Sequence, residues 1–135
     1  MISDYNKGFL SESVIEELCN RHQKVFLDTK KVLGRWAENA AFIKINDYEY
    51  RKSIPYITKS MNDRLIHTRG SNGCDFRGIN YPVEQSSVRD TSGAGDSFMA
   101  ALVIEYLKTA DIISSIKSAN SAASKVVKTR GVGVI

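Results

Sequence analysis

A strand end, a small-residue turn and a helix start follow one another in Val88-Arg89-Asp90-Thr91-Ser92-Gly93-Ala94-Gly95-Asp96-Ser97-Phe98. Gly93 and Gly95 carry no side chain where the backbone must bend, so consecutive N–H groups can converge on one anion. The positive end of the dipole of the following helix favours the same anion. The segment therefore predicts a phosphate-binding turn of the kind found in α/β folds.

Asp96 falls in the first turn of that predicted helix, beside the anion site. A carboxylate in this position can accept the proton of an attacking hydroxyl, which is the chemistry of phosphoryl transfer to an alcohol. An Asp in a first turn also complements the helix dipole, and Gly-x-Gly turns are frequent in α/β proteins. Spacing alone favours this structural role and leaves catalysis open.

Short apolar runs alternate with helical patterns along the rest of the chain. The helical segments repeat apolar residues every three or four positions, whereas the strand-like ones are short and rich in β-branched and aromatic residues. We expect strands at 24–28, 41–46 and 64–68, the end of a strand at Ile2, a hairpin of 74–78 and 81–88 joined around Ile79-Asn80, helices at 11–21, 97–107 and 111–128, and a loop with a short helix at 52–63. The alternation predicts an α/β domain with a mostly parallel sheet flanked by helices.

The composition fits one globular domain. The chain has 135 residues, of which 42% are hydrophobic and 25% charged, and this excludes a disordered, a collagen-like or a disulfide-scaffold protein. Its two cysteines have neither C-x-x-C spacing nor a nearby histidine pair, so we expect reduced thiols and no structural metal. No apolar run approaches the roughly 18 residues of a bilayer span, and the first residues lack a signal-peptide pattern. We therefore expect a cytoplasmic protein.

The formal net charge of +4 would suit a polyanionic ligand. The basic residues are scattered, however, and acidic residues interrupt most basic stretches. A nucleic-acid partner is therefore not expected, and a nucleotide remains compatible with the charge.

Residues 90–98 closely resemble the C-terminal signature of the ribokinase (PfkB) family of carbohydrate kinases. The resemblance implies a three-layer, ribokinase-like α/β fold and ATP-dependent phosphoryl transfer to a sugar or sugar phosphate. It also implies that Asp96 is the general base and that the amides of Gly93, Ala94 and Gly95 form the anion hole. Asp90 and Ser92 match positions that bind a monovalent cation, such as K⁺, in many members.

Two further segments resemble family motifs in the family's order. Asn46 and Glu49 match the Asn-x-x-Glu motif, whose side chains organise Mg²⁺, water and phosphates. Without the resemblance, the same pattern predicts a helix capped by Asn46. Thr68, Gly70 and Gly73 match the Thr-x-Gly-x-x-Gly turn along the phosphates and ribose of the nucleotide, a segment that alone would be an ordinary tight turn.

The C-terminal residues add two weaker matches. Asn120 corresponds to a position near the adenine, although by itself it is a polar residue on a helix flank. Arg130-Gly131-Val132 resembles the closing turn of the nucleotide pocket, which makes Gly131 a candidate nucleotide-binding residue.

The first residues resemble the heptose-phosphate kinase branch, which makes precursors of ADP-heptose. This likeness rests on Ser3-Asp4-Tyr5-Asn6-Lys7-Gly8 and Asp28-Thr29-Lys30. Lys7 and Lys30 could contact phosphate groups of the substrate or nucleotide, because a lysine ammonium is a compact charge that seeks phosphate. An equally weighted alternative is that both are solvated residues at strand ends.

Whole members of the family are much longer. We therefore expect residues 1–135 to be a single domain, the C-terminal nucleotide-binding half, without the N-terminal sugar-binding half and its lid. Such a chain would have an open sheet edge, which favours self-association or the N-terminal half as a partner. A non-catalytic ATP-binding module remains the alternative function, and the sequence identifies neither the sugar nor its hydroxyl.

Overall fold

The computed structural model describes residues 1–83 and 94–133, and of Ser71, residues 94–96 and residues 124–133 it describes only the backbone. The chain, expected to be a single domain, divides into two compact units. Unit 1 comprises Met1–Thr68 and Asp75–Ile79, and unit 2 comprises Arg69–Cys74 and Asn80–Ile135.

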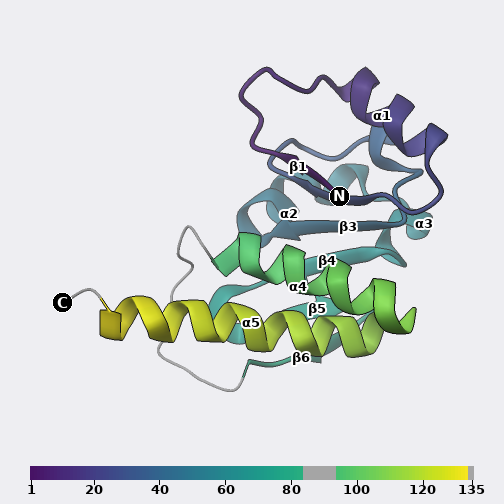
Figure 1. Cartoon of the computed structure of the whole chain (residues 1–135). Coiled ribbons are helices and arrows are strands. Elements are labelled where there is room, and N and C mark those ends of the chain that lie inside the picture. The colour runs from purple at the N-terminus through teal and green to yellow at the C-terminus, as the bar shows by residue number, and fades with distance from the viewer. Residues whose placement is uncertain (84–93, 134–135) are drawn as a thin grey trace. The chain divides into compact units, whose positions relative to one another are not determined.

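The strands form one sheet in which they follow one another in chain order (Figure 1). Their bounds are β1 (Ile2–Asp4), β2 (Phe26–Thr29), β3 (Phe42–Asn46), β4 (Leu65–Thr68), β5 (Cys74–Phe76) and β6 (Ile79–Tyr81). The first four strands pair in parallel. The expected mostly parallel α/β sheet is confirmed, and each expected strand of unit 1 lies within two residues of its predicted bounds.

The central strands are buried on both faces, as parallel strands covered by helices require. In β3 every residue from Phe42 to Ile45 is buried, including Lys44. Lys44 Nζ lies 3.6 Å from Asp28 Oδ1 on β2, its register partner, so the buried charge is compensated.

The hairpin of β5 and β6 turns two residues earlier than predicted. Arg77 and Gly78 form the turn with φ angles of 53° and 78°, the left-handed values that a type I′ turn needs at both central positions. The predicted turn residues, Ile79 and Asn80, belong to β6 instead. The prediction failed because an arginine rarely adopts a left-handed backbone, although Gly78 gave the local signal. β6 ends at Tyr81, and residues 84–88 of the predicted strand lie outside the described residues.

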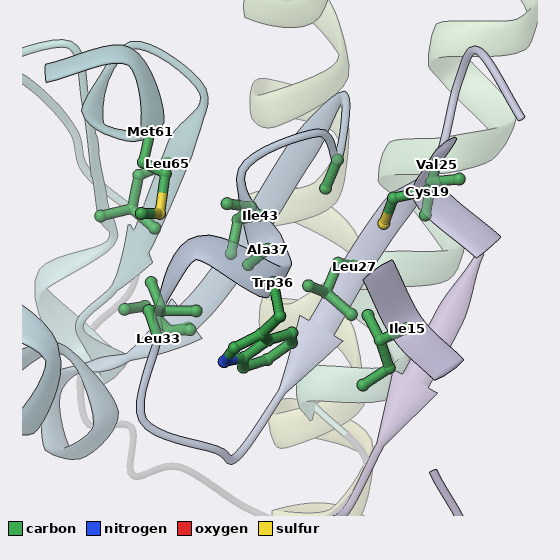
Figure 2. Packing of buried hydrophobic residues seen from close by; sticks show 12 residues of the cluster. Ile15, Cys19, Val25, Leu27, Leu33, Trp36, Ala37, Ile43, Met61 and Leu65 are labelled. Atoms are coloured by element: carbon green, nitrogen blue, oxygen red, sulfur yellow. The ribbon is translucent and has the colours of Figure 1, made fainter. Parts of the chain in front are cut away.

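Helix α1 (Glu12–Arg21) begins at the N-cap Ser11, whose hydroxyl accepts a hydrogen bond from the Val14 amide. Its apolar face joins the core of unit 1, where the Trp36 ring lies near Leu27 and Ile15 (Figure 2). Trp36 comes from a 3₁₀ turn, η1 (Arg35–Ala37). The predicted helix at 11–21 is confirmed.

The segment after β3 contains α2 (Asp47–Ser53), the 3₁₀ turn η2 (Ile54–Tyr56) and α3 (Lys59–Asn62). Pro55 occupies the first turn of η2, where its missing N–H costs nothing. The expectation of a loop with a short helix over 52–63 is confirmed.

Unit 2 contains two helices that pack against each other, α4 (Ala94–Thr109) and α5 (Ile112–Gly133) (Figure 1). Phe98, Met99 and Leu102 of α4 and Ile116 and Ala119 of α5 are buried. Neither these nor the other described helices have the length and apolar character needed to cross a membrane.

The closing turn predicted at residues 130–132 is wrong, because α5 continues through these residues to Gly133. A glycine in a helix interior costs only about 1 kcal/mol relative to alanine, and no proline follows Ile112 to stop the helix. Gly131 therefore lies in a helix and not in a turn.

A buried ion pair ties the carboxyl end of β1 to the residues that follow β2. Lys31 Nζ lies 3.0 Å from Asp4 Oδ2 and donates hydrogen bonds to Asp4 Oδ1 (3.3 Å) and Asn6 Oδ1 (3.0 Å). The Thr29 hydroxyl and the Asn6 amide donate to the same carboxylate at 2.8 and 2.9 Å. Burial raises the pKa of Asp4, but the hydrogen bonds from Asn6, Thr29 and Lys31 outweigh it and hold the pKa below its ordinary value.

We expect Asp4→Asn to lower the free energy of unfolding by about 3–5 kcal/mol, because it leaves Lys31 charged and unpaired in the interior. The double substitution Asp4→Asn with Lys31→Met should restore part of that loss. The exposed pair of Glu17 and Arg21 supplies the control, since Glu17→Gln should cost less than about 1 kcal/mol. Urea denaturation of the four proteins measures these differences, and a double variant no more stable than Asp4→Asn would contradict the pairing.

The lowered pKa of Asp4 also predicts an acid dependence. Its carboxylate contributes stability above the unfolded-state pKa of about 3.9, and that contribution is lost as the pH falls through the lower folded-state value. As the pH falls from 6 into the acid range, the free energy of unfolding of the wild-type chain should therefore decrease by an amount that Asp4→Asn does not show. Parallel pH profiles of the two chains would contradict this assignment.

Candidate functional site

The carboxyl ends of the parallel strands β1–β4 bring polar residues to one edge of unit 1. Asp4 is opposite Thr29 in the register, and Asn46 is opposite Thr68. Ligand sites of parallel α/β sheets form at this edge, because the loops that leave the strands meet there. The predicted residues Lys7, Lys30, Asn46, Glu49 and Thr68 all belong to or follow these strand ends.

Asn46 and Glu49 form a capping box at the start of α2. Asn46 Oδ1 accepts from the Glu49 amide at 2.9 Å, and Glu49 Oε1 accepts from the Asn46 amide at 3.1 Å. The helix-capping interpretation is therefore confirmed. The cap also fixes both side chains at the strand end, and Glu49 is buried there.

One oxygen of this pair, Glu49 Oε2, fits the needs of a magnesium ion. Magnesium prefers oxygen ligands and keeps several of its waters. Among the described residues, Glu49 Oε2 accepts no hydrogen bond, so the cap uses only one of the two carboxylate oxygens. This oxygen is available to the ion or to a water bound to it.

His67, which lies within the strand predicted at 64–68, contacts the first residue of α2. His67 Nε2 lies 2.8 Å from Asp47 Oδ1, and Arg51 Nη2 lies 2.7 Å from Asp47 Oδ2. The hydrogen bond with His67 lowers the pKa of Asp47, and the nearby Arg51 lowers it further. The Tyr50 ring stacks on His67 with 4.0 Å between centroids. The one sequence signal is that Asp47 follows Asn46 and His67 precedes Thr68.

The turn at residues 68–73 requires its second glycine. The Arg69 amide donates to the Gly73 carbonyl at 2.7 Å, and the 3₁₀ turn η3 (Gly70–Asn72) lies between them. Gly73 has φ of 79°, and a Cβ there would lie 2.1 Å from the Tyr81 carbonyl oxygen. Gly70 has φ of 57°. The tight turn is confirmed, and the Thr68 hydroxyl donates to the Ile45 carbonyl at 3.3 Å in unit 1.

Asn120 is buried in unit 2 and has a structural partner. Its Nδ2 donates to the Tyr81 carbonyl at 2.9 Å, which fixes the amide and leaves Oδ1 for another donor. Asn120 therefore has a structural partner and is not only a polar residue on the flank of α5.

The structure describes little of the signature residues 90–98. Helix α4 begins at Ala94, so Ala94 and Gly95 are its first residues and Asp96 is its third. Asp90, Ser92 and Gly93 lie outside the described residues. The helix predicted at 97–107 is present but begins three residues earlier, at Ala94, so Gly95 lies in the helix and not in the turn before it. The roles of these side chains stay predictions.

Lys7 and Lys30 are both exposed, as the alternative for them expected. Lys7 lines a pocket of about 360 Å³ together with Ser3, Asp4, Tyr5, Phe9 and Leu10. Lys30 Nζ lies 5.7 Å from the centroid of the Tyr5 ring. The sequence analysis missed the buried Lys31 beside them, because a lysine that follows a strand gives no sign of an interior partner.

A family model matches most of the chain. Residues 13–134 match the family model described as pfkB family carbohydrate kinase. The chain is 31% identical over 153 residues to the Bifunctional protein HldE of Campylobacter concisus, covering 97% of this chain and 32% of that protein. The protein of the same name from Bradyrhizobium diazoefficiens is 27% identical over 163 residues, with 100% and 32% covered. The chain thus spans about a third of the length of these curated relatives.

Solved structures share the fold at low sequence identity. The nucleoside kinase of Methanocaldococcus jannaschii, an archaeal member of the ribokinase family, has a TM-score of 0.68 at 20% identity, with 87% of this chain and 47% of that chain covered. The ribokinase of Thermotoga maritima has a TM-score of 0.68 at 13% identity, with 92% and 48% covered. With a fold of the ribokinase type and a family match over residues 13–134, the chain belongs to the PfkB family of carbohydrate kinases.

Proposed function

We propose that the chain provides the nucleotide-binding part of a kinase that transfers the γ-phosphoryl group of ATP to a hydroxyl of a sugar or sugar phosphate. The observation that carries the proposal is the family match over residues 13–134, which includes a glycine-rich signature leading into α4. The whole activity is a proposal, because the chain covers about a third of its curated relatives.

The start of α4 would provide the transition-state contacts. The first amides of a helix have no partner within the helix, so those of Ala94 and Gly95, with that of Gly93 before them, are suited to binding the γ-phosphoryl oxygens. Asp96 would accept the proton of the sugar hydroxyl as the hydroxyl oxygen bonds to the γ-phosphorus. The bond from that phosphorus to the β–γ bridging oxygen breaks, and ADP leaves.

The nucleotide would lie along the turn at 68–73, with Thr68, Gly70 and Gly73 near the phosphates and ribose. The close approach of Gly73 to the Tyr81 backbone supports this role, because the turn has one shape and no side chain at its closing residue. Asn120 would contact the adenine through the oxygen that its bond to Tyr81 leaves free. Gly131 lies inside α5, so the proposal does not include it.

Two cation sites belong to the proposal. Asn46 and Glu49 would hold Mg²⁺ or its waters, since Glu49 Oε2 and the second lone pair of Asn46 Oδ1 suit a hard ion. When bound, Mg²⁺ neutralises charge on the phosphates. Asp90 and Ser92 would bind a monovalent cation such as K⁺, as their match to the family signature implies.

A heptose phosphate is the substrate class that we favour. Its support is the name HldE of the curated relatives and the resemblance of the first residues to the heptose-phosphate kinases. Lys7 and Lys30, both exposed at the carboxyl end of strands, would then contact a phosphate of the substrate or nucleotide.

The residues that select the sugar would come from a further part of the kinase, either a domain of sugar-binding type or a second copy of this chain. The alternative is a module that binds ATP without catalysing transfer, which the partial coverage of the relatives also supports. Two measurements separate the kinase from the module. One is calorimetric titration with MgATP, and the other is a coupled assay of ATP consumption with heptose 7-phosphate, ribose or fructose phosphates. Binding with sugar-dependent turnover supports the kinase, binding alone supports the module, and no binding contradicts both.

We expect Asp96→Asn to lower kcat by about 10²- to 10⁴-fold in the protein that shows sugar-dependent turnover, because it removes a general base. The Kd for MgATP should change less than about twofold. Asp111 is a matched control, since it caps the start of α5 through the Ile113 and Ser114 amides and has no proposed role. Turnover of Asp96→Asn that equals that of Asp111→Asn would contradict the base assignment.

We expect Gly73→Ala to weaken MgATP binding at least about tenfold, because the added Cβ meets the Tyr81 backbone and must displace the turn. Gly78→Ala is the matched control: its φ is also +78°, but its Cβ would have nothing within 4 Å. Both glycines have a left-handed φ, so comparing the two MgATP titrations separates the effect of the displaced turn from that of a Cβ at such a φ. Equal affinities of the two variants would exclude the turn from nucleotide binding.

A further inference from the structure

A cluster of three side chains fastens the start of α2 to the end of β4. His67 Nε2 and Asp47 Oδ1 lie 2.8 Å apart, and the Tyr50 ring stacks on the imidazole with an interplanar angle of 8°. The His67 side chain is 11% exposed and the Asp47 side chain 41%, so the imidazole end of the bond is buried and the carboxylate end is partly open to water. None of the three residues is among the predicted site residues.

The register places this cluster between two proposed phosphate-site motifs. Asn46 on β3 is opposite Thr68 on β4, and the residues before them, Ile45 and His67, are also opposite each other. Asp47 follows Asn46 directly, and His67 precedes Thr68 directly. The bond between Asp47 and His67 therefore links the capping box to the strand end that leads into the nucleotide turn.

The surrounding side chains fix the orientation of the His67 ring in this bond. Stacking against Tyr50 restricts rotation of the His67 ring, so that Nε2 faces Asp47. The second carboxylate oxygen of Asp47 pairs with Arg51, whose side chain is 77% exposed. An exposed pair of this kind contributes little, so the contact with His67 is the one that ties the elements together.

We propose that Asp47 and His67 are positioning residues, which hold Asn46 and Glu49 in the arrangement that binds the phosphates and magnesium of ATP. This inference rests on the proposed function. Neither residue needs to touch the nucleotide, because each acts through its chain neighbour. A lost bond would let the N-terminus of α2 move relative to β4, and the free oxygen of Glu49 would move with it.

Two substitutions of His67 separate the hydrogen bond from the stacked ring. His67→Gln can place an amide N–H near the position of Nε2 but cannot stack as a ring does. His67→Phe keeps a ring against Tyr50 and cannot bond to Asp47. Asp47→Ala removes the bond from the other side, and Arg51→Ala is the control that removes only the exposed partner of the same carboxylate.

Hydrogen exchange of the Glu49 amide reports on the capping box without any ligand, because that amide donates to Asn46 Oδ1 at 2.9 Å. We expect its exchange to accelerate about tenfold in His67→Phe and Asp47→Ala, with amides of β3 unchanged. His67→Gln and Arg51→Ala should stay near the wild-type rate. A contribution to general stability alone would accelerate the amides of β3 as well.

Titration of the same proteins with MgATP provides the functional readout. The inference expects Kd to rise about tenfold in His67→Phe and Asp47→Ala, with His67→Gln restoring most of the affinity. Unchanged Glu49 exchange, or faster exchange with unchanged MgATP affinity, would overturn the inference and leave the proposed function intact. A wild-type chain that does not bind MgATP would overturn both.

Discussion

The parallel pairing of β1 to β4 is the constraint on which the rest of unit 1 depends. Its register brings Asp4 opposite Thr29 and Asn46 opposite Thr68, so each strand delivers a polar residue to the same edge. The apolar residues of β2 and β3 can satisfy their backbone groups in the interior only through this pairing. A shift of one residue would move these side chains to the opposite face, and both the core and the edge would be lost.

Hydrogen-bond networks then fix the side chains at these strand ends. Asp4 collects donors from Asn6, Thr29 and Lys31, which joins β1 to the residues after β2. Asp47 and His67 make the corresponding connection between β3 and β4. Both connections join neighbouring strands at the edge where we propose that phosphates bind, so order at this edge comes from contacts across strands as well as from turns.

Features set by local chemistry were predictable from the sequence, and features set by contacts between distant segments were not. The helix at α1, the strands of unit 1 and the cap at Asn46 follow from periodicity and a four-residue motif. The predicted hairpin turn was wrong because Arg77 adopts a left-handed backbone, which few residues other than glycine do. The predicted end of α5 was wrong because residues 130–132 were assigned to a turn from the family resemblance, whereas the helix continues to Gly133. The sequence did not identify Asp47 as the partner of His67, because the two residues are twenty positions apart.

Helix capping and ligand binding at Asn46 and Glu49 are compatible roles. The capping box engages the side-chain oxygen of Asn46 and one of the two carboxylate oxygens of Glu49, and it holds the buried Glu49 carboxylate at the strand end before any ligand arrives. A carboxylate fixed in this way loses little further side-chain entropy when it binds a hydrated cation, so the cap lowers the cost of binding. A structural explanation of a motif therefore does not compete with a functional one when the same bonds that stabilise the helix also preorganise the remaining donor atoms.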